Sequence, residues 1–258
     1  MKPKKIFVGI ACYDRNEDVK FSEEIIKYSF KNHDYKICVY YNGKKEWDNY
    51  LEDILIKDEP ERTQKGCLNG INKTWKEVSN SGCEILLYMQ ANVLILKEEW
   101  VDRALEKMER EGKPFSAFQQ GYPETHTGHF DNFSVEAFLV DIEWAKKTKF
   151  LPIVADGVCI ECRFANQYEN TVGKNNLEKF FARMNWMEPG PHYHNPKDPT
   201  SNRFQNLEAS ISYHHNPKYT ALNLKNFGYP QNEKQVYIKR VVLEEDLSWV
   251  NIGSKTNK

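Results

Sequence analysis

The sequence predicts an α/β fold in which a largely parallel sheet carries helices on both faces. Two observations support this prediction. From Lys5 to Met108, runs of apolar and β-branched residues alternate with stretches whose apolar residues recur at helical spacing. In addition, the run Ile85–Met89 is apolar throughout, as in a strand that is buried on both faces. Such an alternation is typical of parallel sheets covered by helices.

Each element of the amino-terminal half follows from its local pattern. The first strand is an apolar, β-branched run, the second closes at the turn signal Asn42-Gly43, and the third is the buried run named above. Each helix between them places its apolar residues on one stripe. The expected elements are the strands Lys5–Cys12, Tyr35–Tyr41 and Ile85–Met89 and the helices Phe21–Phe30, Glu61–Val78 and Glu98–Met108.

After Pro114 the pattern becomes less regular, and the expected elements are shorter. Four prolines between Pro189 and Asn202 indicate a long loop, and loops of that length are more often functional than structural. A second loop, rich in Gly, His and Thr, is expected at Gly121–His129. The expected strands are Phe115–Gln119, Phe133–Val140, Ala209–Tyr213 and Val236–Val242, and the expected helices are Ile142–Thr148, Gly157–Tyr168 and Leu177–Met184.

Composition and charge exclude several classes of protein. The net charge of −1 is less basic than the footprint that extended nucleic acid binding requires. No apolar run approaches the roughly 20 residues of a membrane span. The six cysteines are scattered among apolar neighbours, which favours reduced thiols over a disulfide framework. These features predict a soluble protein located in the cytoplasm.

A short polar turn, Gln90-Ala91-Asn92, directly follows the buried strand Ile85–Met89. In open α/β sheets, ligands bind in the crevice outside the carboxyl ends of the strands. The sequence therefore predicts that Gln90 and Asn92 face a ligand. The alternative is that both amides hydrogen-bond the backbone of the turn.

Six short segments stand out by their order and spacing along the chain. They are Cys12–Asn16, Asn42, Arg62–Ile71, Leu87–Val93, Phe133–Trp144 and Ala155–Arg163. Together they resemble the GT-A glycosyltransferases, a family of nucleotide-sugar-dependent enzymes. The likeness runs from Lys5 to about Asn170 and implies a Rossmann-like, mixed and mostly parallel sheet flanked by helices. The chain departs from the family at the second strand, where Asn42 stands in place of an acid, and at the DxD signature, where Gln90 and Asn92 replace two carboxylates.

The resemblance implies that different parts of the chain bind the donor and the acceptor. Residues 1–225 would form the glycosyltransferase-like domain, with a donor half at about 1–113 and an acceptor half at about 114–225. Residues 226–258 would form a carboxyl-terminal extension. The nucleotide-sugar donor, expected to be a UDP-sugar, would be bound by Cys12, Tyr13, Asp14, Asn42, Arg62, Lys65, Gln90 and Asn92.

The expected reaction is transfer of a hexose or pentose to an acceptor hydroxyl with inversion. Asp156 lies where many inverting members carry the catalytic base, and a carboxylate within reach of the acceptor can take its proton. Glu161, about one helical turn later, is the second candidate. Asp156 could equally cap a helix that starts at Gly157, and both roles can hold together.

A divalent cation is a further implication of the resemblance. In the family, Mn²⁺ or Mg²⁺ is held by two carboxylates, because hard cations prefer charged oxygen ligands. Here the chain offers uncharged amides, so either the metal is held weakly or Arg62, Lys65 or histidines supply the positive charge instead. His214 and His215 follow an expected strand and are candidate metal ligands. A third interpretation is that the protein has lost its catalytic activity and only binds its ligand.

Other motifs have simpler interpretations. We expect Cys159 and Cys162 to be core residues, because no second Cys/His pair stands at zinc-finger spacing. Five aromatic residues near the Gly/His loop could stack on an acceptor sugar, although most such rings belong to a core. These are Phe115, Phe118, Tyr122, Phe130 and Phe133.

The sequence leaves two other functions and several acceptors open. The first function is a non-catalytic nucleotide- or sugar-binding module, and the second is a sugar nucleotidyltransferase, which the lack of a Gly-rich loop after the first strand disfavours. The acceptor could be a glycan, a lipid-linked sugar or a modified DNA base. A local basic groove for DNA would use Lys218, Lys225, Lys239 and Arg240.

Overall fold

The computed structural model describes most of the amino-terminal two-thirds of the chain and two short strands beyond it. The described residues are 2–48, 51–91, 93–95, 100–120, 132–157, 159–182, 202–205 and 209–212. The expected strand Val236–Val242, the basic residues proposed for DNA, His214, His215 and Asn92 all lie outside them. Within the described residues, no helix is long and apolar enough to cross a membrane.

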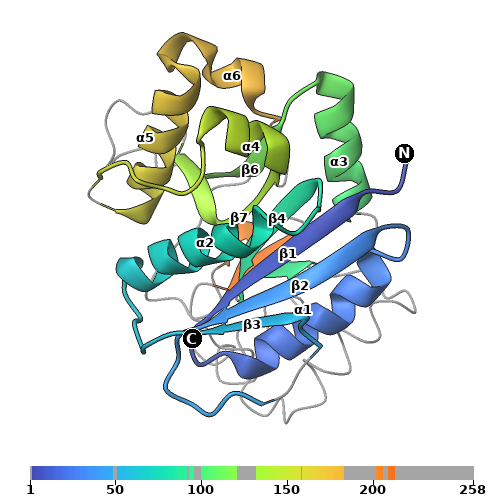
Figure 1. Ribbon diagram of the computed structural model, residues 1–258, viewed down its shortest axis with the longest axis vertical. Coiled ribbons are helices and arrows are strands. Elements are labelled where there is room, and N and C mark those ends of the chain that lie inside the picture. The colour runs from blue at the N-terminus through green and yellow to red at the C-terminus, as the bar shows by residue number, and fades with distance from the viewer. Residues whose placement is uncertain are drawn as a thin grey trace, which may run out of the picture.

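The main sheet, as far as the structure describes it, has six strands in the order β3-β2-β1-β4-β7-β6 (Figure 1). β1, β2, β3 and β4 are parallel, whereas β7 is antiparallel to both β4 and β6. The strands are β1 Lys5–Cys12, β2 Asp34–Tyr41, β3 Ile54–Lys57, β4 Ile85–Gln90, β6 Phe115–Gln120 and β7 Asn132–Asp141. The mixed, mostly parallel sheet that the resemblance implies is therefore confirmed.

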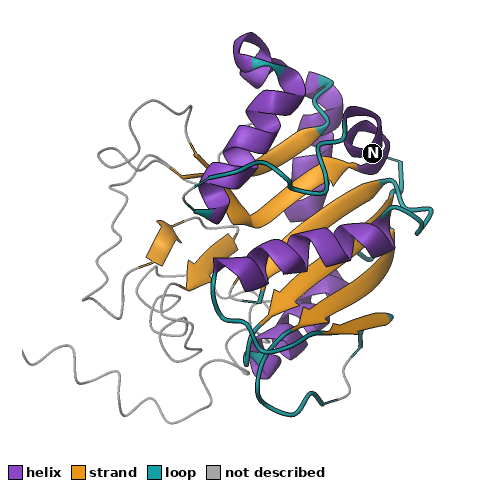
Figure 2. Cartoon of the chain, turned by 60° about the vertical axis from the view of Figure 1, so that its left-hand side comes forward, coloured by secondary structure: helices purple, strands orange, loops and turns teal. Residues whose placement is uncertain are grey.

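Helices cover both faces of this sheet (Figures 1 and 2). The apolar residues of α1 and α3 pack on one face, and those of α2, α4 and α5 pack on the other. This segregation follows from the two-residue period of the strands, which sends successive side chains to opposite faces. The helices are α1 Asn16–Ser29, α2 Gln64–Val78, α3 Trp100–Glu111, α4 Ile142–Thr148, α5 Ile160–Val172, η1 Lys174–Asn176 and α6 Leu177–Phe180.

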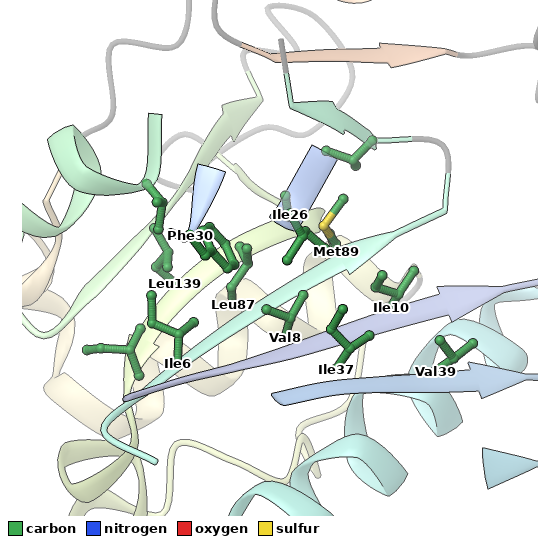
Figure 3. Packing of buried hydrophobic residues seen from close by; sticks show 14 of the residues in the cluster. Ile6, Val8, Ile10, Ile26, Phe30, Ile37, Val39, Leu87, Met89 and Leu139 are labelled. Carbon is green, nitrogen blue, oxygen red and sulfur yellow. The ribbon is translucent and has the colours of Figure 1, made fainter. Parts of the chain in front are cut away.

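The α1 and α3 face of the sheet is an aliphatic layer (Figure 3). Ile6, Val8 and Ile10 of β1 are fully buried there against Ile26 and Phe30 of α1. Burying such side chains contributes about 1.5–3 kcal/mol each, so this layer is a large part of the driving force for folding. The opposite face is rich in aromatic rings, and Phe115 lies at the centre of a cluster with Phe150, Phe164 and Tyr168.

Two glycines let α2 approach the sheet unusually closely. A Cβ atom at Gly70 would lie 3.0 Å from Tyr40 Cδ1 and 3.0 Å from the Tyr88 hydroxyl oxygen. A Cβ atom at Gly66 would overlap the carbonyl oxygen of Glu61 and the side-chain amide of Asn42. Any larger residue would therefore push the helix away from the carboxyl ends of β1, β2 and β4.

A buried histidine links two segments of the chain at the amino ends of the parallel strands. His33 Nδ1 accepts a hydrogen bond of 3.0 Å from the backbone N–H of Lys4, so its Nε2–H donates to Asp102 Oδ1 at 2.6 Å. This pair joins the segment before β2 to α3, and β1 begins beside it. It lies at the amino ends of the parallel strands, far from the strand ends where ligands bind in such sheets.

A second, smaller sheet lies beside the main one. Within the described residues it has three antiparallel strands in the order β5-β9-β8, which are Val93–Ile95, Ala209–Ser212 and Asn202–Gln205. The expected strand Ala209–Tyr213 is thus confirmed over Ala209–Ser212, and Tyr213 lies outside the described residues. Most of the expected Pro-rich loop before it, and the expected loop Gly121–His129, lie outside the described residues.

The structure corrects several predicted element boundaries. β3 was not predicted, because three apolar residues, Ile54–Ile56, are too short a run to show a period. α1 begins at Asn16 rather than Phe21, since Val19 also packs in the core. α6 ends at Phe180 rather than Met184, because Phe181 forms a bridge to Phe115 of β6.

The start of α5 is also later than predicted. The helix begins at Ile160, and Cys159 caps it by accepting a hydrogen bond from the backbone N–H of Cys162. The predicted capping role of Asp156 is therefore wrong. α2 likewise begins at Gln64 rather than Glu61, because the Thr63 hydroxyl caps its amino terminus.

We predict that Gly70→Ala destabilises the protein by about 1–3 kcal/mol, because the added methyl group overpacks the contact between α2 and the sheet. Urea denaturation would measure the loss. The exposed Lys76→Ala in the same helix is the control, and we expect it to change the free energy of unfolding by less than about 0.5 kcal/mol. Equal effects of the two substitutions would contradict the close contact.

Candidate functional site

A pocket of about 360 Å³ lies at the carboxyl ends of β1, β2 and β4. The chain runs from β1 outward to β2 and β3 and then returns to β4 on the other side of β1. The crevice between β1 and β4 is therefore the point where the strand order reverses, which is where open α/β sheets bind ligands. The pocket is lined by Ala11, Cys12, Tyr13, Asp14, Arg15, Tyr40, Asn42, Glu61, Arg62, Thr63, Gly66, Cys67, Gln90 and Ala91.

The structure brings six of the eight expected donor-binding residues to this pocket. They are Cys12, Tyr13, Asp14, Asn42, Arg62 and Gln90. Lys65 is exposed in the first turn of α2 and does not line the pocket, and Asn92 lies outside the described residues. The pocket also includes Tyr40, which the sequence did not single out, and Arg15 and Cys67, which lie in segments of the resemblance but were not among the expected donor-binding residues.

The carboxylate of Asp14 accepts hydrogen bonds from within the protein and stabilises the rim of the pocket. Its Oδ1 accepts hydrogen bonds from the backbone N–H groups of Lys44 and Lys45, at 2.6 and 2.8 Å, and from the Tyr41 hydroxyl at 3.1 Å. Desolvation alone would raise the pKa of Asp14, but these hydrogen bonds outweigh it and hold the pKa below its usual value. Asp14 therefore holds the loop after β2 against the loop after β1.

The side chain of Asn42 is also hydrogen-bonded within the protein. The side-chain Nδ2 of Asn42 donates a 2.6 Å hydrogen bond to the backbone carbonyl oxygen of Glu61. The backbone carbonyl oxygen of Asn42 accepts a hydrogen bond of 3.2 Å from the N–H of Glu61. These two bonds fix the segment that leads into α2. The Glu61 carboxylate in turn accepts from the backbone and hydroxyl of Thr63, at 3.0 and 2.6 Å. The amino terminus of α2 is thereby held at the pocket.

The positive groups at the pocket come from two arginines and from the start of α2. Arg62 is exposed and lines the pocket directly. Arg15 is mostly buried and ion-pairs with Asp18 through its Nε, while its Nη1 is buried without a hydrogen-bond acceptor. A buried N–H group is normally satisfied by a partner or a ligand. Together with the helix amino terminus, this arrangement suits an anionic ligand.

Gln90 does face the pocket, but its amide is engaged with a thiol. The Nε2 of Gln90 donates to Cys67 Sγ at 3.1 Å. Burial raises the pKa of Cys67, and the negative charges of Glu161 and Glu136 raise it further. Both carboxylates therefore act electrostatically on the Cys67 thiol, which lines the pocket. Glu161, the second candidate base, does not itself line the pocket.

Glu136 is a buried carboxylate near the pocket that the sequence reasoning did not single out. The antiparallel register that pairs Met89 with Ala137 places Glu136 beside Gln90 on the neighbouring strand, although Glu136 does not line the pocket itself. A charged residue within the apolar run of β7 was a signal, because carboxylates are seldom buried without a role.

Asp156 stands apart from the pocket, on an exposed segment that three side-chain amides hold in place. Asn72 exchanges two hydrogen bonds with the backbone of Ile153, at 2.8 and 3.0 Å. Gln167 accepts from the N–H groups of Val154 and Ala155. Asn166 donates to the carbonyl oxygen of Asp156 at 2.8 Å. The carboxylate of Asp156 is therefore presented to solvent from a braced backbone.

The described residues do not fit a divalent-cation site. Among them, no group of three or more His, Cys, Asp or Glu side chains is arranged to hold a metal ion. At the end of β4, Gln90 presents an amide that donates to a thiol rather than a charged oxygen ligand. The expected ligands His214 and His215 lie outside the described part of the chain.

Comparison with known proteins finds similarity in solved structures alone, since no protein-family model and no curated protein matches the sequence. A Drosophila β-1,4-galactosyltransferase in complex with manganese, UDP-Gal and xylobiose is 12% identical, with 91% of this chain and 79% of that chain covered and a TM-score of 0.46. A mannosyltransferase from Pyrobaculum calidifontis with GDP-Man and Mn²⁺ is 8% identical, with coverage of 97% and 72% and a TM-score of 0.47. TarS from S. aureus is 9% identical, with coverage of 93% and 69% and a TM-score of 0.47.

We predict that Asp14→Asn lowers the free energy of unfolding by about 1 kcal/mol at pH 7, because the variant keeps the shape but loses the charge that strengthens three hydrogen bonds. The pKa of Asp14 is lower in the folded protein than in the unfolded chain. Its stabilisation is therefore present above about pH 4 and disappears as the pH falls through the folded-state pKa.

Urea titrations of both proteins between pH 7 and pH 3 would measure this difference. The gap in unfolding free energy should narrow as the pH falls toward 3. Asp34→Asn, at an exposed position, is the matched control and should show no gap at either end. A gap for Asp14→Asn that is independent of pH would contradict the role of the charge.

Proposed function

We propose that the protein is a nucleotide-sugar-dependent glycosyltransferase whose donor binds in the pocket at the carboxyl ends of β1, β2 and β4. The observation that carries the proposal is the position of this pocket at the point where the strand order reverses, with six of the expected donor-binding residues in its wall. All fourteen residues that line the pocket come from the part between Ala11 and Ala91, which supports a donor half at about 1–113.

The donor's diphosphate is the group that the positive side of the pocket suits best. In sugar transfer the bond between the sugar and the diphosphate breaks, and negative charge grows on the leaving diphosphate. Fixed positive groups stabilise such developing charge in the transition state. Arg62, the buried Nη1 of Arg15 and the amino terminus of α2 supply them from the chain itself.

The acceptor hydroxyl must lose its proton as the new bond forms. We assign this step to Asp156, which the bracing by Asn72, Asn166 and Gln167 presents to solvent from a fixed backbone. The outcome would be inversion at the transferred carbon, because a single base supports direct displacement. Glu161 is the second candidate, and its proximity to Cys67 supports it. The acceptor half would be residues 114–225, with 226–258 as an extension.

A specific observation favours a second function. Gln90 ends the strand where the resemblance implies carboxylates, and its amide is bonded to Cys67. A chain with this change could bind a nucleotide sugar without transferring it. Binding without release of nucleoside diphosphate in the presence of any acceptor would identify such a module.

We predict that one nucleotide sugar from a panel raises the melting temperature by about 5 °C at 100 times its dissociation constant, because a ligand of the folded state stabilises it by mass action. Each compound is tested with Mn²⁺ and with EDTA, and a shift that survives EDTA is expected. Arg62→Gln should weaken binding about tenfold, since it removes a charge from the diphosphate site. Arg110→Gln on α3 is the control and should bind as the natural chain does. A panel without any shift would contradict donor binding.

We predict that Asp156→Asn lowers transfer by about 10²–10⁴-fold, because the amide cannot accept the proton of the acceptor. Release of nucleoside diphosphate from the stabilising donor, with a mixture of oligosaccharide acceptors, measures this loss. The thermal shift by the donor should persist. Glu161→Gln distinguishes the two candidates: full loss in this variant with activity retained in Asp156→Asn would assign the base to Glu161.

A further inference from the structure

Two thiols meet in the first turn of α5. The sulfur atoms of Cys159 and Cys162 lie 2.8 Å apart, and Cys159 Sγ also accepts a 3.2 Å hydrogen bond from the backbone N–H of Cys162. All six cysteines lie within the described residues and carry reduced thiols. The other four are spread over β1, β2, α2 and the turn before β4. This pair is therefore distinct in having its sulfur atoms in direct contact.

The structure corrects the expectation that both thiols are core residues. Cys162 is 8% exposed and packs in the core, but Cys159 is only partly buried at the helix cap. One sulfur can thus be reached from solvent, and the second lies directly behind it. That is the arrangement that thiol–disulfide exchange requires, with an accessible attacking thiol and a nearby resolving thiol.

A zinc site does not explain the pair within the described residues. Structural zinc takes four ligands, and no group of three or more His, Cys, Asp or Glu side chains gathers here or elsewhere in the described chain. Glu161 lies between the two cysteines in sequence, and its charge acts on Cys159. It does not complete a ligand set with them.

We propose that Cys159 and Cys162 form a reversible intrachain disulfide by exchange with a low-molecular-weight disulfide. The Cys159 thiolate attacks one sulfur of that disulfide, forms a mixed disulfide and releases the first small thiol. Cys162 then loses its proton, attacks the Cys159 sulfur and releases the second small thiol. The two cysteines are oxidised, and the small disulfide accepts the two electrons and two protons. This chemistry is independent of the proposed transfer of sugars.

The local electrostatics determine how the exchange responds to pH. Burial, together with the hydrogen bond with Cys162, raises the pKa of Cys159 to about 12. The reactive thiolate is therefore scarce at pH 7, and exchange should accelerate as the pH rises. A thiol of high pKa is also a poor leaving group, so reduction of the disulfide, once it has formed, should be slow.

The disulfide would form next to the segment that carries Asp156. Arg163 and Asn166 of the same helix donate to the carbonyl oxygens of Gly157 and Asp156, at 3.3 and 2.8 Å. Closing the bond shortens the sulfur separation to about 2.05 Å. The cap of α5 would thus be joined covalently to its first turn beside these contacts.

The test exposes the reduced full-length chain to glutathione disulfide under native conditions at pH 7 and pH 9. Acid quenching, alkylation and tryptic digestion then report on the peptide Phe150–Arg163, which contains both cysteines. We expect this peptide to escape alkylation and to be about 2 Da lighter than its unalkylated reduced form, because two hydrogen atoms leave. The rate should rise at least about tenfold from pH 7 to pH 9, since the thiolate fraction rises.

Single substitutions separate the two roles. Cys162→Ser should trap glutathione on Cys159, and Cys159→Ser should slow the first exchange by at least about tenfold while its hydroxyl still caps α5. Cys83→Ser, elsewhere in the fold, should leave the oxidation unchanged. The proposal would be overturned if the peptide stayed reduced, if glutathione remained on Cys159 in the natural chain, or if other cysteine pairs formed in equal yield.

Discussion

The close contact between α2 and the sheet is the constraint on which the site depends. Because Gly66 and Gly70 have no side chains, the helix can lie directly over β1, β2 and β4. Its amino terminus then reaches the carboxyl ends of these strands, and the Glu61–Thr63 segment closes one side of the pocket. Asn42 and Asp14 hold the neighbouring loops in the positions that this approach creates. Backbone packing therefore builds the pocket before any ligand chemistry is considered.

The distribution of charge around the pocket differs from the one that the family resemblance implies. The end of β4 offers an amide, whereas Asp14 and Glu61 line the pocket and the charges of Glu136 and Glu161 act on Cys67 in its wall. Arginines and the start of α2 supply positive charge. The negative charges at the pocket therefore come from residues other than Gln90 at the end of β4.

Local patterns were sufficient to predict much of the fold. The alternation of apolar runs identified the central strands, whereas six pocket residues were expected from the family resemblance, and the polar turn after β4 also indicated Gln90. The position of Glu136 beside Gln90 could not be predicted in this way, because it arises from an antiparallel neighbour far away in sequence. The contact between Cys159 and Cys162 depends on where α5 starts, and the sequence pattern placed that start three residues too early. β3 was missed because a short edge strand has too few residues to show a period.

Hydrogen–deuterium exchange with the nucleotide sugar that stabilises the protein most would test the central claim most directly. If the pocket at the carboxyl ends of β1 and β4 is the donor site, exchange should slow in the Ala11–Arg15 loop and in the segment from Glu61 to Cys67. The segments at the amino ends of the strands, around His33, should exchange as in the unliganded protein. Tight binding that slows exchange around His33 and leaves exchange at the start of α2 unchanged would contradict this position of the donor site.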